Sequence, residues 1–318
     1  MIRRFAVLPA LLLASSLTAN AQETKLNVMV FNIWGGGANE GKPVDETVAA
    51  IKAANADIIA LMETRLESDP CTADSCPATG DSAAPAIAAA LGFNVYDQKG
   101  EGPTLWANAV ISRYPITGTL KDELGVSIDV NGKTVYMLAA HLDDSPYQPY
   151  QLLGIEYGDA PFIKTEAEAI EWAEKTRGAA MDSLIAAAGG LTDAAAIFIA
   201  GDFNEPSNLD WTEAAVKAGQ QPVAVAWPAT SKLEKAGFVD LYRAANPDPV
   251  AKPAFTWTPT SEPSDPEDHH DRIDFVFGKA PGLKVTSASI VGEKQPEADI
   301  VVTPWPSDHR AVVATVEF

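Results

Sequence analysis

The stretch Ala200-Gly201-Asp202-Phe203-Asn204 follows directly on the apolar run Ala194 to Ile199. Such a run predicts a buried strand, because it leaves no polar face for water. Side chains alternate along a strand, so Asp202 and Asn204 are expected to point to the same side. A carboxylate and a carboxamide at a strand end indicate a site, since the first can hold a hard cation or a water and the second can donate to an oxyanion.

Three other apolar runs also lead into a polar residue. Residues 25–33 deliver Asn32 into the glycine turn 35–37, residues 56–62 lead to Glu63, and residues 135–140 lead to His141. A carboxylate buried alone is costly, so Glu63 should be paired, exposed or bound to a metal. Asn32 could also simply cap its turn, and His141 could be a hydrogen-bonded structural residue.

The C-terminal third repeats this pattern. Asp274 lies between Ile273 and Phe275 in the apolar strand expected over 272–277, so it needs a partner on the opposite face. The segment Ser307-Asp308-His309-Arg310 opens a last strand over 311–316.

The remaining periodicity predicts an alternation of helices and strands. Asn131-Gly132 suits the two-residue turn of a hairpin with arms 117–130 and 133–140. Helical spacing is found over 43–55, 83–91, 163–188, 211–218 and 231–236, and further strands are expected at 93–96, 106–113, 238–242 and 255–257.

Composition limits the function classes. The chain has 318 residues and a formal net charge of −20. Such a chain should be soluble and should repel anionic lipid and nucleic acid, unless a local basic groove or bound cations reverse the field. Residues 22–318 suit one large α/β domain or two smaller ones, and no linker divides them.

The N-terminus has the pattern of a secretory signal. Arg3 and Arg4 precede an apolar segment over 5–13, and Ala19-Asn20-Ala21 fits a cleavage site. We therefore expect residues 1–21 to be removed and the protein to be secreted or periplasmic, although a retained anchor is the alternative. Cys71 and Cys76 would then form a local disulfide.

Residues 143–172 differ from the rest in their aromatic and acidic content. Long loops beside a catalytic strand end usually shape a binding cleft. The alternative is an insertion that packs on itself. His269 and His270 lie in a charged loop and are expected to be solvated or to face a substrate.

Taken together, the motifs resemble the endonuclease/exonuclease/phosphatase superfamily, the group of DNase I-like enzymes. The similarity spans nearly the whole mature chain and rests on these motifs: Phe31-Asn32, Met62-Glu63, Ser112-Arg113-Tyr114-Pro115, His141-Leu142, Gly201-Asp202-Phe203-Asn204, Arg272-Ile273-Asp274 and Ser307-Asp308-His309-Arg310. The resemblance implies a four-layer α/β/β/α sandwich, with two mixed sheets face to face and helices outside.

The same resemblance implies roles for individual residues. Glu63 would bind Mg²⁺ or Mn²⁺, with Asn32 and Asp308 near the same ion. Oxygen ligands without clustered cysteines agree with a hard cation rather than zinc.

The other site residues would act on water and phosphate. His309, oriented by Asp274, would be the base toward the attacking water or its electrostatic equivalent. Asp202 and Asn204 would hold the water and a phosphoryl oxygen, and His141 would donate to the phosphate. Asn108 and Arg113 are candidates for substrate contact or for support of the strand end.

These roles imply an exported, metal-dependent phosphoesterase that acts by direct attack of water on phosphorus. Its substrate stays open between nucleic acid, as for a DNase-type endonuclease, a sphingomyelin-like phospholipid, an inositol phosphate and another small ester. Two other classes remain: a non-catalytic carbohydrate or protein binder, and an enzyme acting on glycosidic bonds. We expect a monomer without stable membrane insertion.

Overall fold

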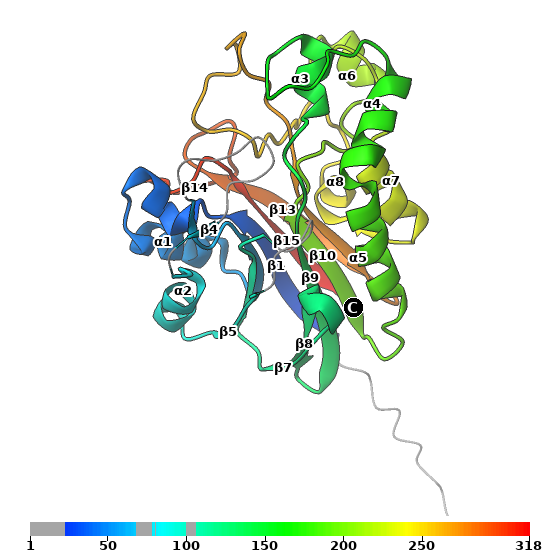
Figure 1. The fold of residues 1–318 in the computed structure, drawn as a ribbon. Helices are drawn as coiled ribbons and strands as arrows, with labels where there is room; N and C mark the ends of the chain where they lie inside the picture. Colours follow the sequence, from blue (N-terminus) through cyan, green and yellow to red (C-terminus); the bar gives the residue numbers. More distant parts are fainter. Residues whose placement is uncertain (1–22, 68–77, 80, 100–105) are drawn as a thin grey trace, which may run out of the picture.

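Two β-sheets packed face to face, with helices on both outer sides, make up the molecule (Figure 1). The computed structural model describes residues 23–67, 78–79, 81–99 and 106–318. The strand order is β14-β13-β15-β1-β2-β6-β5 in the first sheet and β11-β12-β10-β9-β8-β7 in the second. Both sheets mix parallel and antiparallel pairs. This confirms the four-layer sandwich expected from the sequence.

The sheets and helices have the following bounds. The first sheet consists of β1 (Lys25–Asn32), β2 (Ile58–Met62), β5 (Asn94–Asp97), β6 (Ala109–Ser112), β13 (Lys284–Gly292), β14 (Ile300–Val301) and β15 (Ala311–Glu317). The second consists of β7 (Ile116–Thr119), β8 (Gly125–Val130), β9 (Lys133–His141), β10 (Ala196–Asp202), β11 (Val239–Asp240) and β12 (Asp274–Lys279), and β3 (Leu66–Glu67) pairs with β4 (Ala78–Thr79). The helices are α1 (Val44–Ala54), α2 (Ala84–Leu91), α3 (Gln148–Leu153), α4 (Glu166–Ala173), α5 (Ala179–Gly189), α6 (Glu213–Lys217), α7 (Pro228–Lys235) and α8 (Leu241–Ala245), with short turns η1 (Gly35–Glu40), η2 (Lys121–Glu123) and η3 (Glu174–Gly178).

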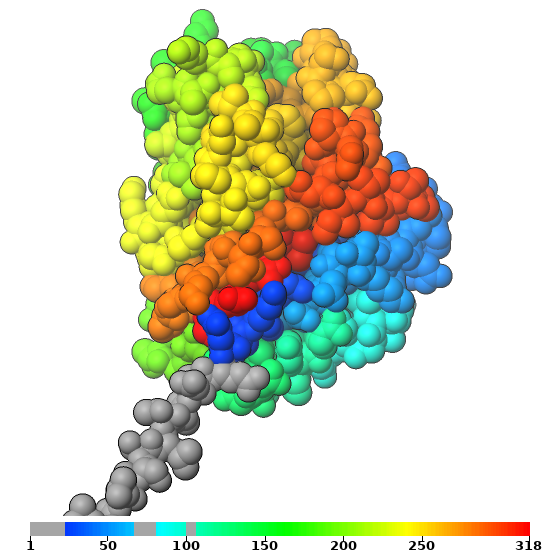
Figure 2. Space-filling model, turned by 180° about the vertical axis from the view of Figure 1, so that it is seen from behind, coloured from blue at the N-terminus to red at the C-terminus, as the bar shows by residue number. Residues whose placement is uncertain are grey.

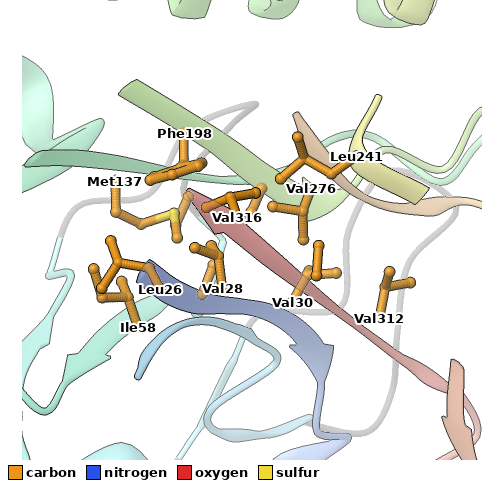
Figure 3. Close-up of a cluster of buried hydrophobic side chains, with 14 of the residues drawn as sticks. Leu26, Val28, Val30, Ile58, Met137, Phe198, Leu241, Val276, Val312 and Val316 are labelled. Carbon is orange, nitrogen blue, oxygen red and sulfur yellow. The ribbon is translucent and has the colours of Figure 1, made fainter. Parts of the chain in front are cut away.

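The main core lies between the two sheets. Leu26, Val28 and Val30 of β1 point into it, where they meet residues such as Met137 and Phe198 of the second sheet (Figure 3). Met29 and Phe31 of β1 instead pack against α1 and α2. Because this part of β1 is buried on both faces, residues 28–31 are continuously apolar.

The predicted hairpin is confirmed at its turn. Asn131 and Gly132 both have positive φ, 55° and 84°, as a type I′ turn between β8 and β9 requires. Its first arm was predicted too long, because residues 117–130 are divided by η2. The strand predicted at 255–257 is also wrong: Trp257 makes only isolated bridges, to Asp271 and His309.

Polar strand ends of the two sheets meet at one edge of the molecule, where Asn32 at the end of β1 donates to Asp202 at the end of β10. β1 runs parallel to β2, and β9 runs parallel to β10, so the C-terminal ends of these four strands lie at the same end of the sandwich. Among the described residues, no helix is both long and apolar enough to cross a membrane.

Candidate metal and catalytic site

Three site residues lie side by side across the second sheet. Asp202 at the end of β10 is in register with His141 of parallel β9 and with Asp274 of antiparallel β12. Gly201 allows this close approach, because a Cβ there would lie 1.9 Å from the Ala140 carbonyl oxygen. Packing between β9 and β10 therefore explains why the residue before Asp202 is a glycine.

The first sheet supplies the opposite wall. Asn32 ends β1 and Glu63 follows β2, with φ +54° at Glu63. A non-glycine residue with positive φ is uncommon and is found disproportionately at functional sites. The Ser307 hydroxyl donates to the Asn32 carbonyl oxygen (2.7 Å) and accepts from the His309 amide (3.1 Å), which holds His309 beside the end of β1.

Asn32 joins the two sheets. Its Nδ2 donates to Glu63 Oε1 (2.8 Å) and to Asp202 Oδ2 (3.1 Å), while its Oδ1 accepts from the Trp34 amide (3.3 Å). In this orientation Asn32 bridges two carboxylates with its amide nitrogen, whereas the expected role of metal ligand would use its oxygen.

Glu63, His141 and Asp202 form a group that could hold a metal ion. His141 Nε2 lies 3.8 Å from both Glu63 Oε1 and Asp202 Oδ2, and the three ligand atoms all lie within 4.8 Å of one another. Two carboxylate oxygens and one imidazole nitrogen converge here, and a cation bound between them would offset the charge of the two carboxylates. The two carboxylates suit Mg²⁺ or Mn²⁺, so the residues fit the expected metal.

His309 is held between two carboxylates. Its Nδ1 lies 2.8 Å from Asp274 Oδ2, and its Nε2 lies 3.6 Å from Asp202 Oδ2. Burial lowers the pKa of His309, but Asp274 and Asp202 more than offset this effect, so its pKa lies well above the usual value. Burial raises the pKa of Asp274 to about 6 against the opposing charge of His309. The pair therefore holds a proton, which resides on the imidazole because carboxylates face both ring nitrogens.

Asn204, Asp308 and Asn108 lie at the same end of the molecule in supporting positions. Asn204 has φ +48°, and its amide group donates to the Leu142 carbonyl oxygen (2.9 Å), so it has left the strand direction of Asp202. Burial raises the pKa of Asp308, which belongs to neither metal-capable group found among the described residues. Asn108 is fully buried just before β6, opposite the end of β2.

Comparison with known sequences decides the family. Residues 29–309 match the Endonuclease/Exonuclease/phosphatase family, a span that contains every strand-end residue described above. The chain belongs to this family.

The relatives agree with the family assignment. An uncharacterized protein, F14F9.5, of Caenorhabditis elegans is 28% identical over 95% of this chain and 94% of its own length. Among solved structures, TDP2 from C. elegans has a TM-score of 0.51 at 18% identity over 92% of this chain and 75% of its own. A 3'-5' exonuclease from Neisseria meningitidis has a TM-score of 0.53 at 15% identity over 92% and 99%. At these identities, the two solved structures share the fold with this family member.

Arg113 lies at the wrong end for substrate contact. It follows β6, and its Nε donates to Asp57 Oδ1 (2.8 Å), beside the start of β2, while its guanidinium lies over the Phe93 ring. Because β6 runs antiparallel to β2, the motif places Arg113 a full strand length from Glu63. Of the two roles expected for Arg113, these contacts agree with support of the strand end and not with substrate contact.

His269 and His270 are packed inside their loop, so the expectation of solvated or substrate-facing residues is corrected. His270 is buried with Nε2 2.8 Å from Ser261 Oγ, and His269 Nε2 lies 2.8 Å from the Gln221 side-chain amide. Burial lowers the pKa of His269 to about 4. Their rings pack against other aromatic residues, His269 against Trp211 and His270 against Phe255.

The insertion 143–172 packs on a neighbouring segment rather than on itself alone. Ile163, Ala169 and Ala173 contact Trp211 and Trp227 in a separate apolar cluster. Buried Arg177 anchors its start by donating to the carbonyl oxygens of Asp143 (2.7 Å) and Pro146 (3.0 Å).

Sequence reasoning missed the buried pair of Arg177 and Glu205. Arg177 Nη1 lies 4.0 Å from Glu205 Oε2, and Glu205 Oε1 accepts from the Ala229 amide (2.7 Å). The helical spacing could have indicated that Arg177 is buried. Arg177 precedes the buried Met181 by four positions and the buried Leu184 by seven, so it lies on the same face of the helix.

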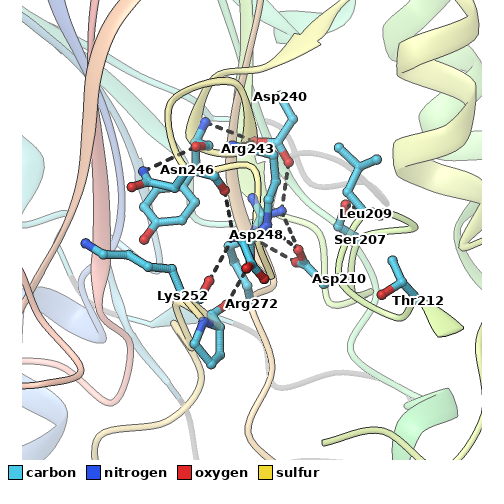
Figure 4. Close-up of polar contacts among 12 residues, drawn as sticks. Ser207, Leu209, Asp210, Thr212, Asp240, Arg243, Asn246, Asp248, Lys252 and Arg272 are labelled. Atoms are coloured by element: carbon cyan, nitrogen blue, oxygen red, sulfur yellow. Dashed lines mark hydrogen bonds and ion pairs between the residues drawn. The ribbon is translucent and has the colours of Figure 1, made fainter. Parts of the chain in front are cut away.

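A second buried network fixes the approach to Asp274. Arg272 donates to Asp210 (2.9 Å) and Asp240 (2.8 Å), and Arg243 donates to Asp210 (2.5 Å) (Figure 4). Asp240 also caps α8. The arginine of the Arg272-Ile273-Asp274 motif is therefore structural.

Two predictions lie outside the described residues. They are the signal segment 1–21 and the disulfide between Cys71 and Cys76.

Proposed function

We propose that the protein is a divalent-metal-dependent phosphoesterase that hydrolyses a phosphodiester or phosphomonoester by in-line attack of water. The observation that carries the proposal is the convergence of Glu63, His141 and Asp202 beside the pair His309–Asp274. Family membership supports it, since the family is named for endonucleases, exonucleases and phosphatases.

The proposed roles follow from the atoms that face the site. Bound Mg²⁺ or Mn²⁺ would supply a Lewis acid for the phosphoryl oxygens. Glu63, His141 and Asp202 would hold it, and Asn32 fixes two of these carboxylates. Asp274 fixes the Nδ1 side of His309, and the protonated Nε2 would stabilise charge on a phosphoryl oxygen. A cation that neutralises Asp202 would favour the neutral imidazole, whose Nε2 would take a proton from the water.

The test is hydrolysis of bis(p-nitrophenyl) phosphate by residues 22–318 with Mg²⁺ or Mn²⁺. We expect turnover that EDTA abolishes and that Asp202→Ala and His309→Ala each reduce by about 10²-fold or more. Arg113→Ala is the matched control at the far end of the sheet and should retain activity. Undiminished turnover by both site variants would refute the mechanism.

We also propose export with removal of residues 1–21 and a disulfide between Cys71 and Cys76, on the sequence pattern alone. N-terminal sequencing of the protein from the cell envelope or medium should begin at Gln22. An N-terminus at Met1 in the cytoplasm would contradict this.

A further inference from the structure

Two chain segments border the site end of the sandwich. Residues 143–159 follow His141 and Leu142, and residues 255–271 lead into Arg272-Ile273-Asp274. The second segment is coloured gold and stands at the top of the molecule in the front and rear views (Figures 1 and 2). We call the two segments the rim.

Acidic side chains dominate the charge of the rim, although burial raises the pKa of Asp271 to about 8 and so leaves this one carboxyl largely protonated at pH 7. Neither segment contains a lysine or an arginine. Their acidic residues are Asp143, Asp144, Glu156 and Asp159 in the first segment and Glu262, Asp265, Glu267, Asp268 and Asp271 in the second.

Hydrogen bonds connect the two segments of the rim to each other, and Trp257 connects the rim to the pair of His309 and Asp274. The Tyr147 hydroxyl donates to Asp271 Oδ2 (2.8 Å), and the Tyr150 hydroxyl donates to Asp268. Trp257 Nε1 donates to the Tyr150 oxygen (3.5 Å), and the Trp257 ring packs 4.9 Å from the ring of His309. Through Tyr150 and Trp257, the carboxylate of Asp268 is therefore connected to the surroundings of His309.

Cationic side chains near the site are already engaged. Lys42 donates to the Trp305 carbonyl oxygen, Arg177 is buried under the first rim segment, and Arg310 pairs with Glu293. In the described part of the chain, no lysine or arginine forms an ion pair with Asp202, Asp274 or Asp308. Segments 68–77 and 100–105 contain no lysine or arginine in their sequence.

From this charge arrangement we infer that the site takes a small phosphate ester whose remainder is uncharged or cationic, and that the rim rejects polyanionic nucleic-acid strands. The inference rests on the proposed phosphoesterase activity and names its substrate class. Nucleic-acid binding depends on lysine and arginine contacts to phosphates, and the rim offers carboxylates in their place. Within about 10 Å at 0.1 M salt, these charges act on a substrate before it reaches the metal group.

The sign of the salt dependence separates the two substrate classes. We would measure kcat/KM with Mn²⁺ for p-nitrophenyl phosphorylcholine, bis(p-nitrophenyl) phosphate and a single-stranded oligodeoxythymidylate at low and high salt. We expect the choline ester to be preferred over the oligonucleotide, and rising salt to improve oligonucleotide cleavage by screening repulsion. A basic-groove nuclease would show the opposite sign.

Charge reversal in the exposed part of the rim tests whether the rim carboxylates cause the substrate preference. The triple variant Glu262→Lys, Asp265→Lys and Glu267→Lys should raise the oligonucleotide-to-choline-ester ratio of kcat/KM by about tenfold. The matched control reverses the same number of charges at the opposite end of the sheets, with Glu23→Lys, Asp193→Lys and Glu317→Lys, and should leave the ratio unchanged.

Each outcome decides a different claim. Cleavage of none of the three substrates with metal present would refute the proposed function itself. Cleavage that favours the oligonucleotide, with activity falling as salt rises, would refute the substrate class while the phosphoesterase stands. An equal ratio change in the rim and control variants would refute the role of the rim.

Discussion

The imidazole of His309 has its two nitrogens in different surroundings. Nδ1 is fixed by Asp274 at 2.8 Å, and Nε2 faces Asp202 at 3.6 Å. An aspartate in the apolar strand β12 is tolerated because it is paired in this way. Because Nδ1 is held by Asp274, Nε2 is the nitrogen that acts on the water and the phosphate.

Asp274→Asn tests this assignment at the level of one residue. The amide can present its NH₂ group to Nδ1, which favours the wrong tautomer, so we expect kcat on bis(p-nitrophenyl) phosphate to fall on the order of 10²- to 10⁴-fold. The KM should change little, because Asp274 does not face the substrate. A variant with wild-type kcat and an intact thermal transition would contradict the orienting role.

Gly201→Ala tests the close approach of β9 and β10. Since the new Cβ would meet the Ala140 carbonyl oxygen at 1.9 Å, we expect a loss of about 1–3 kcal/mol or more in unfolding free energy, measured by urea denaturation. Gly189→Ala in α5 is the control, because nothing lies within 4 Å of its Cβ position. Equal unfolding free energies of the two variants would contradict the claim that Gly201 is required for the close approach of β9 and β10.

For individual residues, the sequence predicted which residues form the site more accurately than it predicted the contacts that they make. The motif residues Asn32, Glu63, His141, Asp202 and His309 do meet at one edge. The orientation of their hydrogen bonds depends on how the two sheets pack at this edge, as the Asn32 amide shows. No local sequence pattern specifies that packing. The motif alone left two roles open for Arg113, because a motif residue can lie at either end of a strand.

Among the elements, the insertion and the loop 255–271 depend on each other. Tyr147 and Trp211 both donate to the buried carboxyl of Asp271, at 2.8 Å each. This polar contact, rather than an extended sheet, positions Trp257 behind His309.

Tyr147→Phe tests that connection. The change leaves Asp271 Oδ2 without its donor in a buried position, so unfolding free energy should fall by about 1–3 kcal/mol. Tyr157→Phe, in the exposed part of the insertion, should cost less. Comparison of the two urea midpoints checks the prediction, and a larger loss for Tyr157→Phe would contradict it.

Elements with strong periodicity were predicted well, and weakly patterned ones were not. β1, α1 and β10 follow from uninterrupted apolar runs or helical spacing. β13 was missed because its first half is mostly exposed and rich in serine and threonine, so only its pairing with β15 identifies it. Residues 255–257 look like a strand in sequence, but they only bridge to Asp271 and His309.

For the whole molecule, two buried carboxyls make stability depend on pH. Burial raises the pKa of Asp271 to about 8 and that of Glu205 to about 7. Unfolded carboxyls titrate near about 4, so between these values the folded chain binds more protons than the unfolded one. Stability from these groups is therefore greatest at low pH and is lost as pH rises through the folded pKa values.

We accordingly expect the unfolding free energy to fall between pH 5 and pH 7, where the folded carboxyls hold protons that the unfolded ones have lost. Asp271→Asn and Glu205→Gln, which mimic the protonated groups, should each make the slope shallower by up to about 1.4 kcal/mol per pH unit. The exposed Glu267→Gln is the control. Slopes identical to wild type in both buried variants would contradict the assignment.

At the scale of the fold, the resemblance of the motifs to the endonuclease/exonuclease/phosphatase superfamily predicted the four-layer sandwich, which the two packed sheets confirm. Charge composition predicted the acidic character but not its location. The rim became visible only when residues 143–159 and 255–271 were placed beside the site.

Metal binding by the site is the central claim, and calorimetric titration of Mn²⁺ into the protein tests it most directly. We predict that the wild type and Arg113→Ala each bind Mn²⁺, and that the affinity of Asp202→Asn is lower by more than about tenfold. Equal Mn²⁺ affinity in Asp202→Asn and the wild type would contradict it.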